Sequence, residues 1–257
     1  MKSYFTAIGS WGDVLACLGN IYFTNPETIN IIYFGFDPNI KNFLEIQPKV
    51  REVVHIIPKN DTHFLRLTTL ASMKADLNQL FKIEGKIIAT HVDHDALPNR
   101  NFQCNISKTY EKNNKILFQP YSLQSNRLDE HWPFWMDALN WLLEENDIIL
   151  TGNSKSHQLF KNEPLPEFPT HPRLTNLIDQ TDSMEDVFAL AEACKFVITT
   201  NNCLASWTAM KEIPALIMHT KRVNPYFYRW INCGQNIILP NETTLEEFKA
   251  KFLIYYI

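Results

Sequence analysis

One aspartate near the start of the chain follows a strand-like segment and stands where a carboxylate could act as a base. Residues 2–17 read Lys-Ser-Tyr-Phe-Thr-Ala-Ile-Gly-Ser-Trp-Gly-Asp-Val-Leu-Ala-Cys, and Gly9 and Gly12 allow a tight turn into the helical run that begins at Asp13. In an open α/β sheet, ligands bind beyond the carboxyl ends of the strands, which is where this carboxylate would lie. Asp is also a favoured residue at or near a helix N-cap, so capping alone would explain Asp13. Position alone favours the cap over catalysis.

A second polar loop could bind an anion. The apolar stretch 196–200 leads into Asn201, Asn202 and Cys203, and a helical run with Ser206 near its start follows. The free N–H groups and the positive dipole end of a helix suit a phosphate or pyrophosphate. Asn is equally a preferred N-cap, and the spacing on its own favours the cap slightly.

A third group of polar residues, His91, Asp93, His94 and Asp95, follows another strand-like segment. Imidazole and carboxylate groups are typical metal ligands. No further ligands with matching spacing are found in the sequence, so the group favours a polar loop that contacts an acceptor, and no metal is expected. The aromatic residues Trp132, Phe134, Trp135 and Trp141 have near-helical spacing, which is typical of a core, although Trp132 could instead line a ligand pocket.

Alternating strands and helices must position these side chains. The expected strands cover residues 4–8, 29–36, 50–57, 86–90, 115–119, 147–151, 196–200 and 215–219, with a further short segment at 174–177. The expected helices cover residues 13–23, 38–47, 62–81, 133–145, 184–193, 205–211 and 244–253. This alternation predicts doubly wound parallel sheets. It is interrupted between residues 97 and 114, so we expect two domains, 1–112 and 113–257.

Composition and charge exclude several classes of protein. The chain has 257 residues, of which 45% are hydrophobic and 20% charged, so it is globular and long enough for two domains. Its net charge of -4 gives no overall basic field for nucleic acid or an anionic membrane. Five cysteines, an odd number with no Cys-x-x-Cys pair, favour free thiols in a reducing cytoplasm. With no signal peptide and no membrane-spanning run, we expect a soluble cytoplasmic protein.

Four stretches, in this order and spacing, resemble glycosyltransferase family nine, the heptosyltransferase-like group with the GT-B architecture. They are residues 8–15 (Ile-Gly-Ser-Trp-Gly-Asp-Val-Leu), 117–122 with 131–135 (Leu-Phe-Gln-Pro-Tyr-Ser and His-Trp-Pro-Phe-Trp), 148–152 (Ile-Ile-Leu-Thr-Gly), and 197–206 with Pro214 (Val-Ile-Thr-Thr-Asn-Asn-Cys-Leu-Ala-Ser). The resemblance implies an α/β, GT-B-like fold, in which two Rossmann-like doubly wound domains face each other across a crevice.

The resemblance also implies a function. Residues 1–112 would hold a hydroxyl acceptor, a saccharide or lipopolysaccharide-like molecule, and residues 113–257 would bind the nucleotide-diphosphate sugar. Asp13 would be the catalytic base of a transfer that inverts the anomeric carbon, with no metal and no cofactor besides the donor sugar. The expected donor-binding residues are Ser122, Arg127, His131, Thr151, Gly152, Thr200, Asn201, Asn202, Cys203 and Ser206. The expected acceptor-binding residues are Ser10, Trp11, Gly12, His91, Asp93 and His94.

The chain departs from the family pattern at two places. Asn201, Asn202, Cys203 and Ser206 stand where the family usually has an acidic residue, Ser or Thr, Gly, and His. Glu130 replaces a common lysine, which leaves Arg127 as the nearest cation for the pyrophosphate, and the chain is shorter than typical relatives. A neutral Asn still bonds to ribose or phosphate and repels an anion less than a carboxylate does.

Other functions remain open on the sequence. A glycosyltransferase that acts on a modified DNA base would need a cationic groove, which the net charge does not indicate, so a saccharide acceptor is favoured over DNA. A nucleotide-sugar-binding module that has lost catalysis would bind a nucleoside diphosphate without turnover. A Rossmann-type oxidoreductase is disfavoured because Gly-Ser-Trp-Gly-Asp lacks the G-x-G-x-x-G fingerprint.

Overall fold

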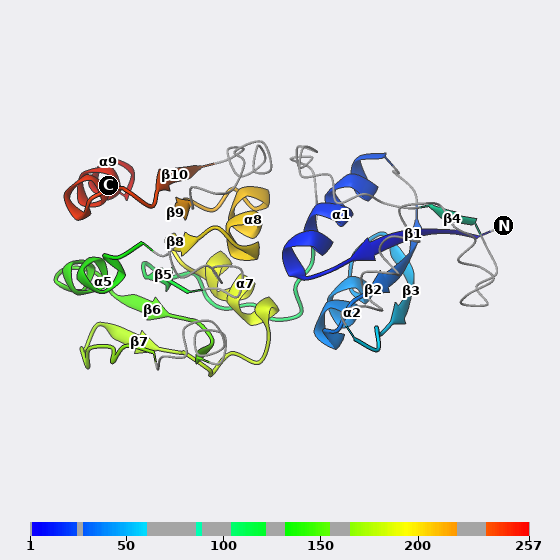
Figure 1. The fold of residues 1–257 in the computed structure, drawn as a ribbon, viewed down its shortest axis with the longest axis horizontal. Coiled ribbons are helices and arrows are strands. Elements are labelled where there is room, and N and C mark those ends of the chain that lie inside the picture. Colours follow the sequence, from blue (N-terminus) through cyan, green and yellow to red (C-terminus); the bar gives the residue numbers. More distant parts are fainter. Residues whose placement is uncertain are drawn as a thin grey trace. The chain divides into compact units, whose positions relative to one another are not determined.

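The chain forms two units, Met1–Ser107 and Lys108–Ile257, each built around its own parallel sheet (Figure 1). The computed structural model describes residues 2–24, 28–60, 86–88, 104–121, 132–154, 165–219 and 235–256. The units divide between Ser107 and Lys108, whereas the loss of sequence rhythm placed the boundary between residues 112 and 113. The acceptor and donor roles of the two units stay predictions.

The first unit alternates strands and helices along the chain. Its described elements are β1 (Ser3–Ile8), α1 (Trp11–Thr24), β2 (Ile29–Phe34), α2 (Pro38–Glu45), β3 (Val50–Ile56) and β4 (Lys86–Ile88). The strands pair in parallel in the order β3-β2-β1-β4. Every residue of β2 is buried, as its continuous apolar sequence predicts for a strand in the middle of a parallel sheet.

Helices α1 and α2 lie on one face of this sheet, where the ring of Trp11 packs edge-on against Phe43 with 5.1 Å between centroids. Helix α2 begins at Pro38 because proline suits the first helical turn, and the side chain of Asp37 accepts the N–H of Asn39. The loops after β1 and β2 are thus tied to helix starts at the carboxyl edge of the sheet.

The second unit has a six-stranded parallel sheet. Its described elements are β5 (Ile116–Gln119), α5 (Trp135–Leu143), β6 (Ile148–Leu150), β7 (Leu174–Asn176), α7 (Met184–Ala193), β8 (Phe196–Thr200), α8 (Cys203–Met210), β9 (Ala215–His219), β10 (Asn236–Pro240) and α9 (Leu245–Tyr256). The strand order β10-β9-β8-β5-β6-β7 is that of a Rossmann fold, in which the chain runs outward from the centre in one direction and then in the other. The order reverses between β5 and β8, and ligands of such sheets bind at the carboxyl ends of the strands at this point.

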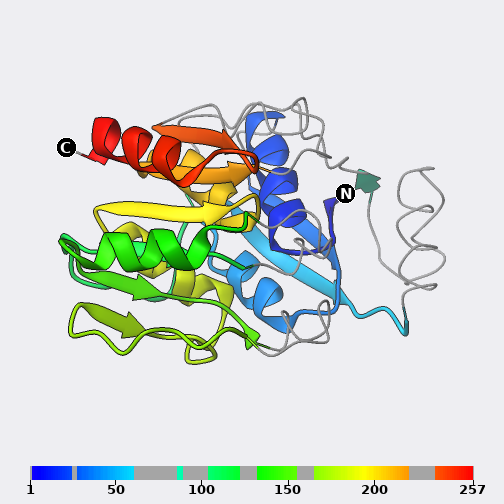
Figure 2. The same ribbon diagram turned by 60° about the vertical axis from the view of Figure 1, so that its left-hand side comes forward.

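Helices cover both faces of the second sheet. Figures 1 and 2 show α5 and α9 on one face and α7 and α8 on the other. The α5 and α9 side is an aromatic core in which Trp132 packs on Trp135 and Phe248, and the indole N–H of Trp132 donates to the carbonyl of Thr243 at 2.7 Å. Trp132 is buried in this core, which confirms the core interpretation of the aromatic cluster.

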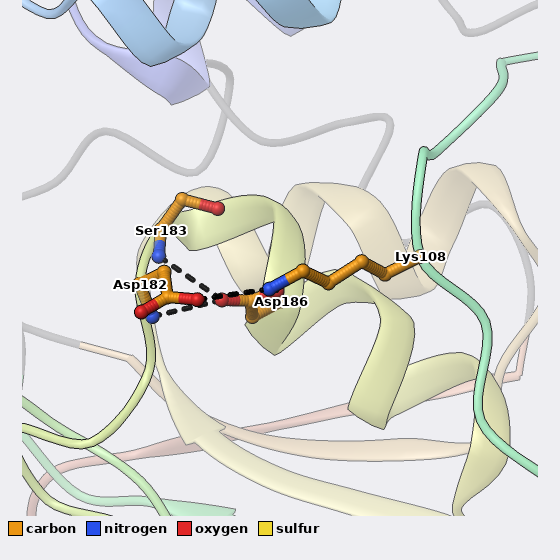
Figure 3. A network of polar contacts seen from close by, with 4 residues as sticks. All are labelled: Lys108, Asp182, Ser183 and Asp186. Atoms are coloured by element: carbon orange, nitrogen blue, oxygen red, sulfur yellow. Dashed lines mark hydrogen bonds and ion pairs between the residues drawn. The ribbon is translucent and has the colours of Figure 1, made fainter.

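The start of the second unit is fixed by an ion-pair network (Figure 3). Lys108 Nζ lies 3.0 Å from Asp182 Oδ2 and 2.7 Å from Asp186 Oδ1. The other carboxylate oxygen of Asp186 accepts the backbone N–H groups of Asp182 and Ser183 at the start of α7. The first residue of the unit is therefore bound to the N-terminus of one of its own helices, where negative charge is favourable.

The sequence located most elements, and α7, β8 and β9 have the predicted bounds. Strand β2 ends at Phe34, two residues before the predicted end, and α5 begins at Trp135 instead of residue 133. Helix α8 begins at Cys203 instead of residue 205 because Asn202 caps it, and α9 continues to Tyr256. Strand β10 was missed. The helix predicted over 62–81 lies outside the described residues.

The described cysteines are free thiols, as the odd number of cysteines in the sequence indicated. Cys17, Cys104, Cys194 and Cys203 are free thiols, and burial raises the pKa of Cys17 and Cys194 to about 12. Among the described helices, none combines the length and the apolarity that crossing a membrane requires.

Candidate functional site

The carboxylate of Asp13 is held in place by the residue that precedes helix α1. Asp13 is the third residue of α1, and its Oδ2 accepts both the backbone N–H and the hydroxyl of Ser10, each at 3.0 Å. The sequence placed the helix start at Asp13, with this residue at or near the N-cap. The helix begins two residues earlier, at Trp11, so Asp13 lies near the N-cap and closes the cap from inside the first turn.

Gly9 is needed for this arrangement. Its φ of +100° is a conformation that residues with a Cβ rarely adopt, and a Cβ added here would lie 2.4 Å from Asp13 Oδ2. The N–H of Gly9 donates to the carbonyl of Phe34 at 3.1 Å, so this residue continues the pairing of β1 with β2. The tight turn that the sequence predicted is confirmed at Gly9, whereas Gly12, which was expected in the same turn, lies within helix α1.

The geometry leaves one oxygen of Asp13 available for chemistry. Both hydrogen bonds of the carboxylate go to Oδ2, and within the described part of the chain Oδ1 has no hydrogen-bond partner. The side chain is half-buried, in the first turn of α1. In the order β3-β2-β1-β4, the direction of winding reverses at β1, so Asp13 lies at the switch point of this sheet. Capping and proton acceptance can therefore use different oxygens of one carboxylate.

The residues beside Asp13 differ in exposure. Ser10 is exposed, Gly12 is half-buried, and Trp11 is only 8% exposed. The indole N–H of Trp11 donates to Asp37 Oδ2 at 2.9 Å, so this side chain joins α1 to the start of α2. Contact of these three residues with an acceptor stays a prediction. His91, Asp93 and His94 lie outside the described residues, and no cluster of potential metal ligands is found in the part of the chain that the structure describes.

In the second unit, Asn202 connects the two strands at the switch point. Its Nδ2 donates to Gln119 Oε1 at the end of β5, at 3.0 Å, and to Thr199 Oγ1 in β8, at 3.1 Å. Its Oδ1 accepts the N–H groups of Leu204 and Ala205 at 2.8 and 3.3 Å. The N-cap interpretation of this loop is therefore confirmed for Asn202, and two N–H groups that an anion could have used are already bonded.

Two other polar groups at the same edge have no hydrogen-bond partner among the described residues. The Oδ1 of Asn201 and the Oγ1 of Thr151 are buried, and neither has a hydrogen bond with another described residue. Asn201 follows β8 and Thr151 follows β6, with β5 between these strands. Buried polar groups are nearly always bonded, because leaving one unpaired costs about 1–3 kcal/mol. Donor binding by Asn201 and Thr151, which the sequence predicted, stays a prediction.

The remaining predicted donor residues have structural contacts or are not described. Thr200 Oγ1 donates to the carbonyl of Met218 at 3.4 Å, and Ser206 Oγ donates to that of Asn202 at 3.4 Å. The carbonyl of Gly152 accepts the N–H of Asp179 at 3.1 Å, and Cys203 opens α8 half-buried. Ser122, Arg127 and His131 lie outside the described residues.

Sequence reasoning missed two residues at these edges, Gln119 and Tyr33. Gln119 is a polar residue at the end of a buried strand, a signal that the sequence did offer. Tyr33 lies within an apolar strand, and its hydroxyl donates to the carbonyl of Gly9 at 3.3 Å. Burial, together with the charges of Asp37 and Asp13, raises the pKa of Tyr33 well above its usual value, so this hydroxyl keeps its proton.

Comparison with known proteins gives matches at the level of structure alone. No protein-family model matches the chain, and no curated protein sequence matches it. The solved structure of a glycosyl transferase of family 9 from Veillonella parvula has a TM-score of 0.64 at 11% identity, and the match covers 98% of this chain and 88% of that one.

Two further structures extend the comparison. ADP-heptose lps heptosyltransferase II of E. coli has a TM-score of 0.63 at 15% identity, with 99% of each chain covered. UDP-GlcNAc 2-epimerase of Methanocaldococcus jannaschii has a TM-score of 0.53 at 11% identity, with 100% of this chain and 93% of that one covered. These likenesses confirm the expected α/β, GT-B-like fold with its two Rossmann-like units. They include both a transferase and an epimerase, so the fold alone does not identify the reaction, which depends on the residues of the site.

Proposed function

We propose that this protein is a glycosyltransferase of the family-nine, heptosyltransferase-like type. It would move a sugar from a nucleotide-diphosphate donor to a hydroxyl group of a saccharide acceptor. The observation that carries the proposal is the carboxylate of Asp13, which is fixed through one oxygen at the switch point of the first sheet while the other oxygen has no partner among the described residues. The likeness to glycosyltransferases of the same fold, which covers 98% and 99% of this chain, supports it.

The reaction needs a base on the acceptor side. Asp13 Oδ1 takes the proton of the acceptor hydroxyl while the hydroxyl oxygen attacks the anomeric carbon. The bond from that carbon to the diphosphate breaks as the new bond forms, so the anomeric configuration inverts and the nucleoside diphosphate leaves with the bonding electrons. The hydrogen bonds from Ser10 keep the carboxylate in one orientation, which reduces the entropy lost on reaching the transition state.

The donor would bind at the edge where β5, β6 and β8 end. The oxygens of Asn201 and Thr151, which have no partner among the described residues, suit the hydroxyl groups of a ribose or sugar, since both can accept a hydrogen bond. Asn201 and Asn202 are neutral, so they do not repel a diphosphate as a carboxylate would. The positive end of α8 and a cation, for which Arg127 is our candidate, would stabilise the leaving group without a metal.

The acceptor class is inferred from a structural neighbour and from the charge of the chain. One structural neighbour is named for lipopolysaccharide, which supports a saccharide or lipopolysaccharide-like acceptor. The net charge of -4 gives no general attraction to DNA. We propose that the protein acts in the cytoplasm and takes its donor, a nucleotide sugar, from there.

The first test is calorimetric titration with ADP, UDP, GDP and CDP, followed by nucleotide sugars of the base that binds. One base should bind selectively and raise the melting temperature, because a ligand that binds only the folded state stabilises it. Transfer is then assayed with that donor and a panel of saccharides that includes lipopolysaccharide core fragments. Donor binding without transfer to any acceptor would favour a binding module, and a change of sugar configuration without transfer would favour an epimerase.

The variant Asp13→Asn tests the base. We expect kcat to fall roughly 10²- to 10⁴-fold with donor affinity unchanged, because only proton acceptance is removed. Asp137→Asn is the matched control, since Asp137 is also an acidic residue in the first turn of a helix, α5. Equal turnover of Asp13→Asn and Asp137→Asn would refute Asp13 as the base.

A further inference from the structure

The peptide group between Gly9 and Ser10 links a buried tyrosine to Asp13. The carbonyl of this group belongs to Gly9 and accepts the hydroxyl of Tyr33 at 3.3 Å. The N–H of the same group belongs to Ser10 and donates to Asp13 Oδ2 at 3.0 Å. A peptide group is planar and trans, so its carbonyl and N–H point in opposite directions and turn together. A contact that fixes the carbonyl therefore fixes the direction of the N–H that holds the carboxylate.

The surroundings of Tyr33 leave its hydroxyl little freedom. The side chain is fully buried in β2, and the ring lies so close over Gly35 that a Cβ there would be 2.1 Å from the hydroxyl oxygen. His55, on the neighbouring strand β3, stacks on the ring with 4.8 Å between centroids and an interplanar angle of 25°. The Nε2 of His55 lies 2.9 Å from the carbonyl of Gly35, which fixes the imidazole in turn.

We propose that Tyr33 is a positioning residue for Asp13, acting through the Gly9–Ser10 peptide. The inference rests on the proposed function, because it assigns Tyr33 to the orientation of the proposed base. Tyr33 does not touch the reacting atoms. Its hydroxyl holds the Gly9 carbonyl, the Ser10 N–H then holds Oδ2, and Oδ1 is left at a constant place. The chain of two hydrogen bonds also polarises the peptide, which strengthens each bond.

The alternative is that Tyr33 only fills the core. Tyr33→Phe separates the two roles, because phenylalanine keeps the ring, its stacking on His55 and its place over Gly35, and loses only the hydroxyl. Tyr4→Phe is the matched control. Tyr4 lies in β1 of the same sheet, is buried to a similar degree, and donates its hydroxyl to Glu52 at 3.2 Å, away from Asp13.

The experiment measures transfer, donor affinity and melting temperature for both variants, with the donor and acceptor found by the screen. We expect Tyr33→Phe to lower kcat about five- to tenfold, the effect of one hydrogen bond, with the acceptor KM changed by less than about twofold. We expect Tyr4→Phe to leave kcat within about twofold of the wild type. If Tyr33 only filled the core, both variants would change the melting temperature, and neither would lower kcat specifically.

A double-mutant cycle with Asp13→Asn then tests whether Tyr33 acts through Asp13. If it does, adding Tyr33→Phe to Asp13→Asn changes the residual rate by less than about twofold, because the oriented base is already absent. An equal fall in rate in both backgrounds would refute the inference, as would a kcat for Tyr33→Phe equal to that of Tyr4→Phe. Asp13→Asn alone reports on the proposed function, so unchanged turnover in that variant would reject the base and the inference with it.

Discussion

Asp13 combines a structural and a chemical property in one side chain. One oxygen completes the start of α1 through Ser10, and the other has no bond among the described residues. The competing interpretations of this residue, a helix cap or a base, are therefore compatible. Asp13→Asn separates the two properties, because the amide oxygen of asparagine can still accept the hydrogen bonds from Ser10 while the amide does not act as a base.

Gly9→Ala tests whether the backbone conformation of this turn positions Asp13. The added Cβ would meet Asp13 Oδ2 at 2.4 Å, and the φ of +100° is unfavourable for alanine. We expect the free energy of unfolding to fall by about 1–3 kcal/mol and kcat to fall because the carboxylate moves.

Gly19→Ala is the matched control for Gly9→Ala. It lies within α1, and nothing within 4 Å would meet its added Cβ. This change should raise the free energy of unfolding by up to about 1 kcal/mol, since alanine favours a helix more than glycine does. Urea unfolding of both variants gives the comparison, and the same sign for both would contradict the structure.

Capping side chains fix the starts of several helices in both units. Helix α2 is capped by Asp37, α8 by Asn202, and α7 by the reciprocal contacts of Ser183 and Asp186. The helix α9 has a capping box: the Glu247 carboxylate accepts the N–H and the hydroxyl of Thr244, whose oxygen accepts the N–H of Glu247.

The α9 box predicts a pH dependence of stability. The backbone N–H and then the hydroxyl of Thr244 lower the pKa of Glu247 below 4.5. Since the pKa is lower in the folded state, this contribution is fully present above the unfolded pKa and is lost as the pH falls through the folded pKa. Between about pH 7 and about pH 3, Glu247→Gln should therefore lose less stability than the wild type, measured by urea unfolding.

The control for Glu247→Gln is Glu246→Gln. The carboxylate of Glu246 lies in the same turn, pairs with Lys249 and takes no part in the cap. At neutral pH it should cost less stability than Glu247→Gln, because exposed ion pairs contribute little. A wild-type pH profile identical to that of Glu247→Gln would show that the box does not contribute.

At the scale of the whole molecule, the described residues form two parallel sheets, each with polar groups at a switch point. The first carries the loop from Gly9 to Asp13, and the second carries Gln119, Asn201 and Asn202. We propose that the second unit binds the donor and the first unit binds the acceptor. A measurement that reports on both units of the chain can test this assignment.

Amide hydrogen exchange with and without the nucleoside diphosphate found by calorimetry provides that test. We expect slower exchange in peptides from the second unit, namely those around residues 119, 151–152 and 199–206, since a ligand suppresses local opening where it binds. The peptide with residues 9–13 should show the smaller change. Protection confined to residues 9–13 would reverse the proposed roles of the two units.

The sequence by itself determined the alternation of strands and helices, because the signals are local. Strand β8 is a short apolar run, α7 begins at a Ser-x-x-Asp cap, and both have the predicted bounds. The turn at Gly9 and the importance of the Asn201 loop were also local inferences. The apolar run of β10 was present in the sequence and was missed, although Ile-Ile-Leu between Asn236 and Pro240 is typical of a strand.

Only the tertiary structure decided which of these residues act together. Tyr33 reaches the Gly9 carbonyl because β2 pairs with β1 in a register that sets Ala7 beside Tyr33, and that register depends on packing across the sheet. Gln119 meets Asn202 because β8 crosses back to lie beside β5, after the chain has formed β6 and β7. These two hydrogen bonds join residues that are 24 and 83 positions apart in the sequence. Such contacts follow from strand order, which is a property of the whole fold.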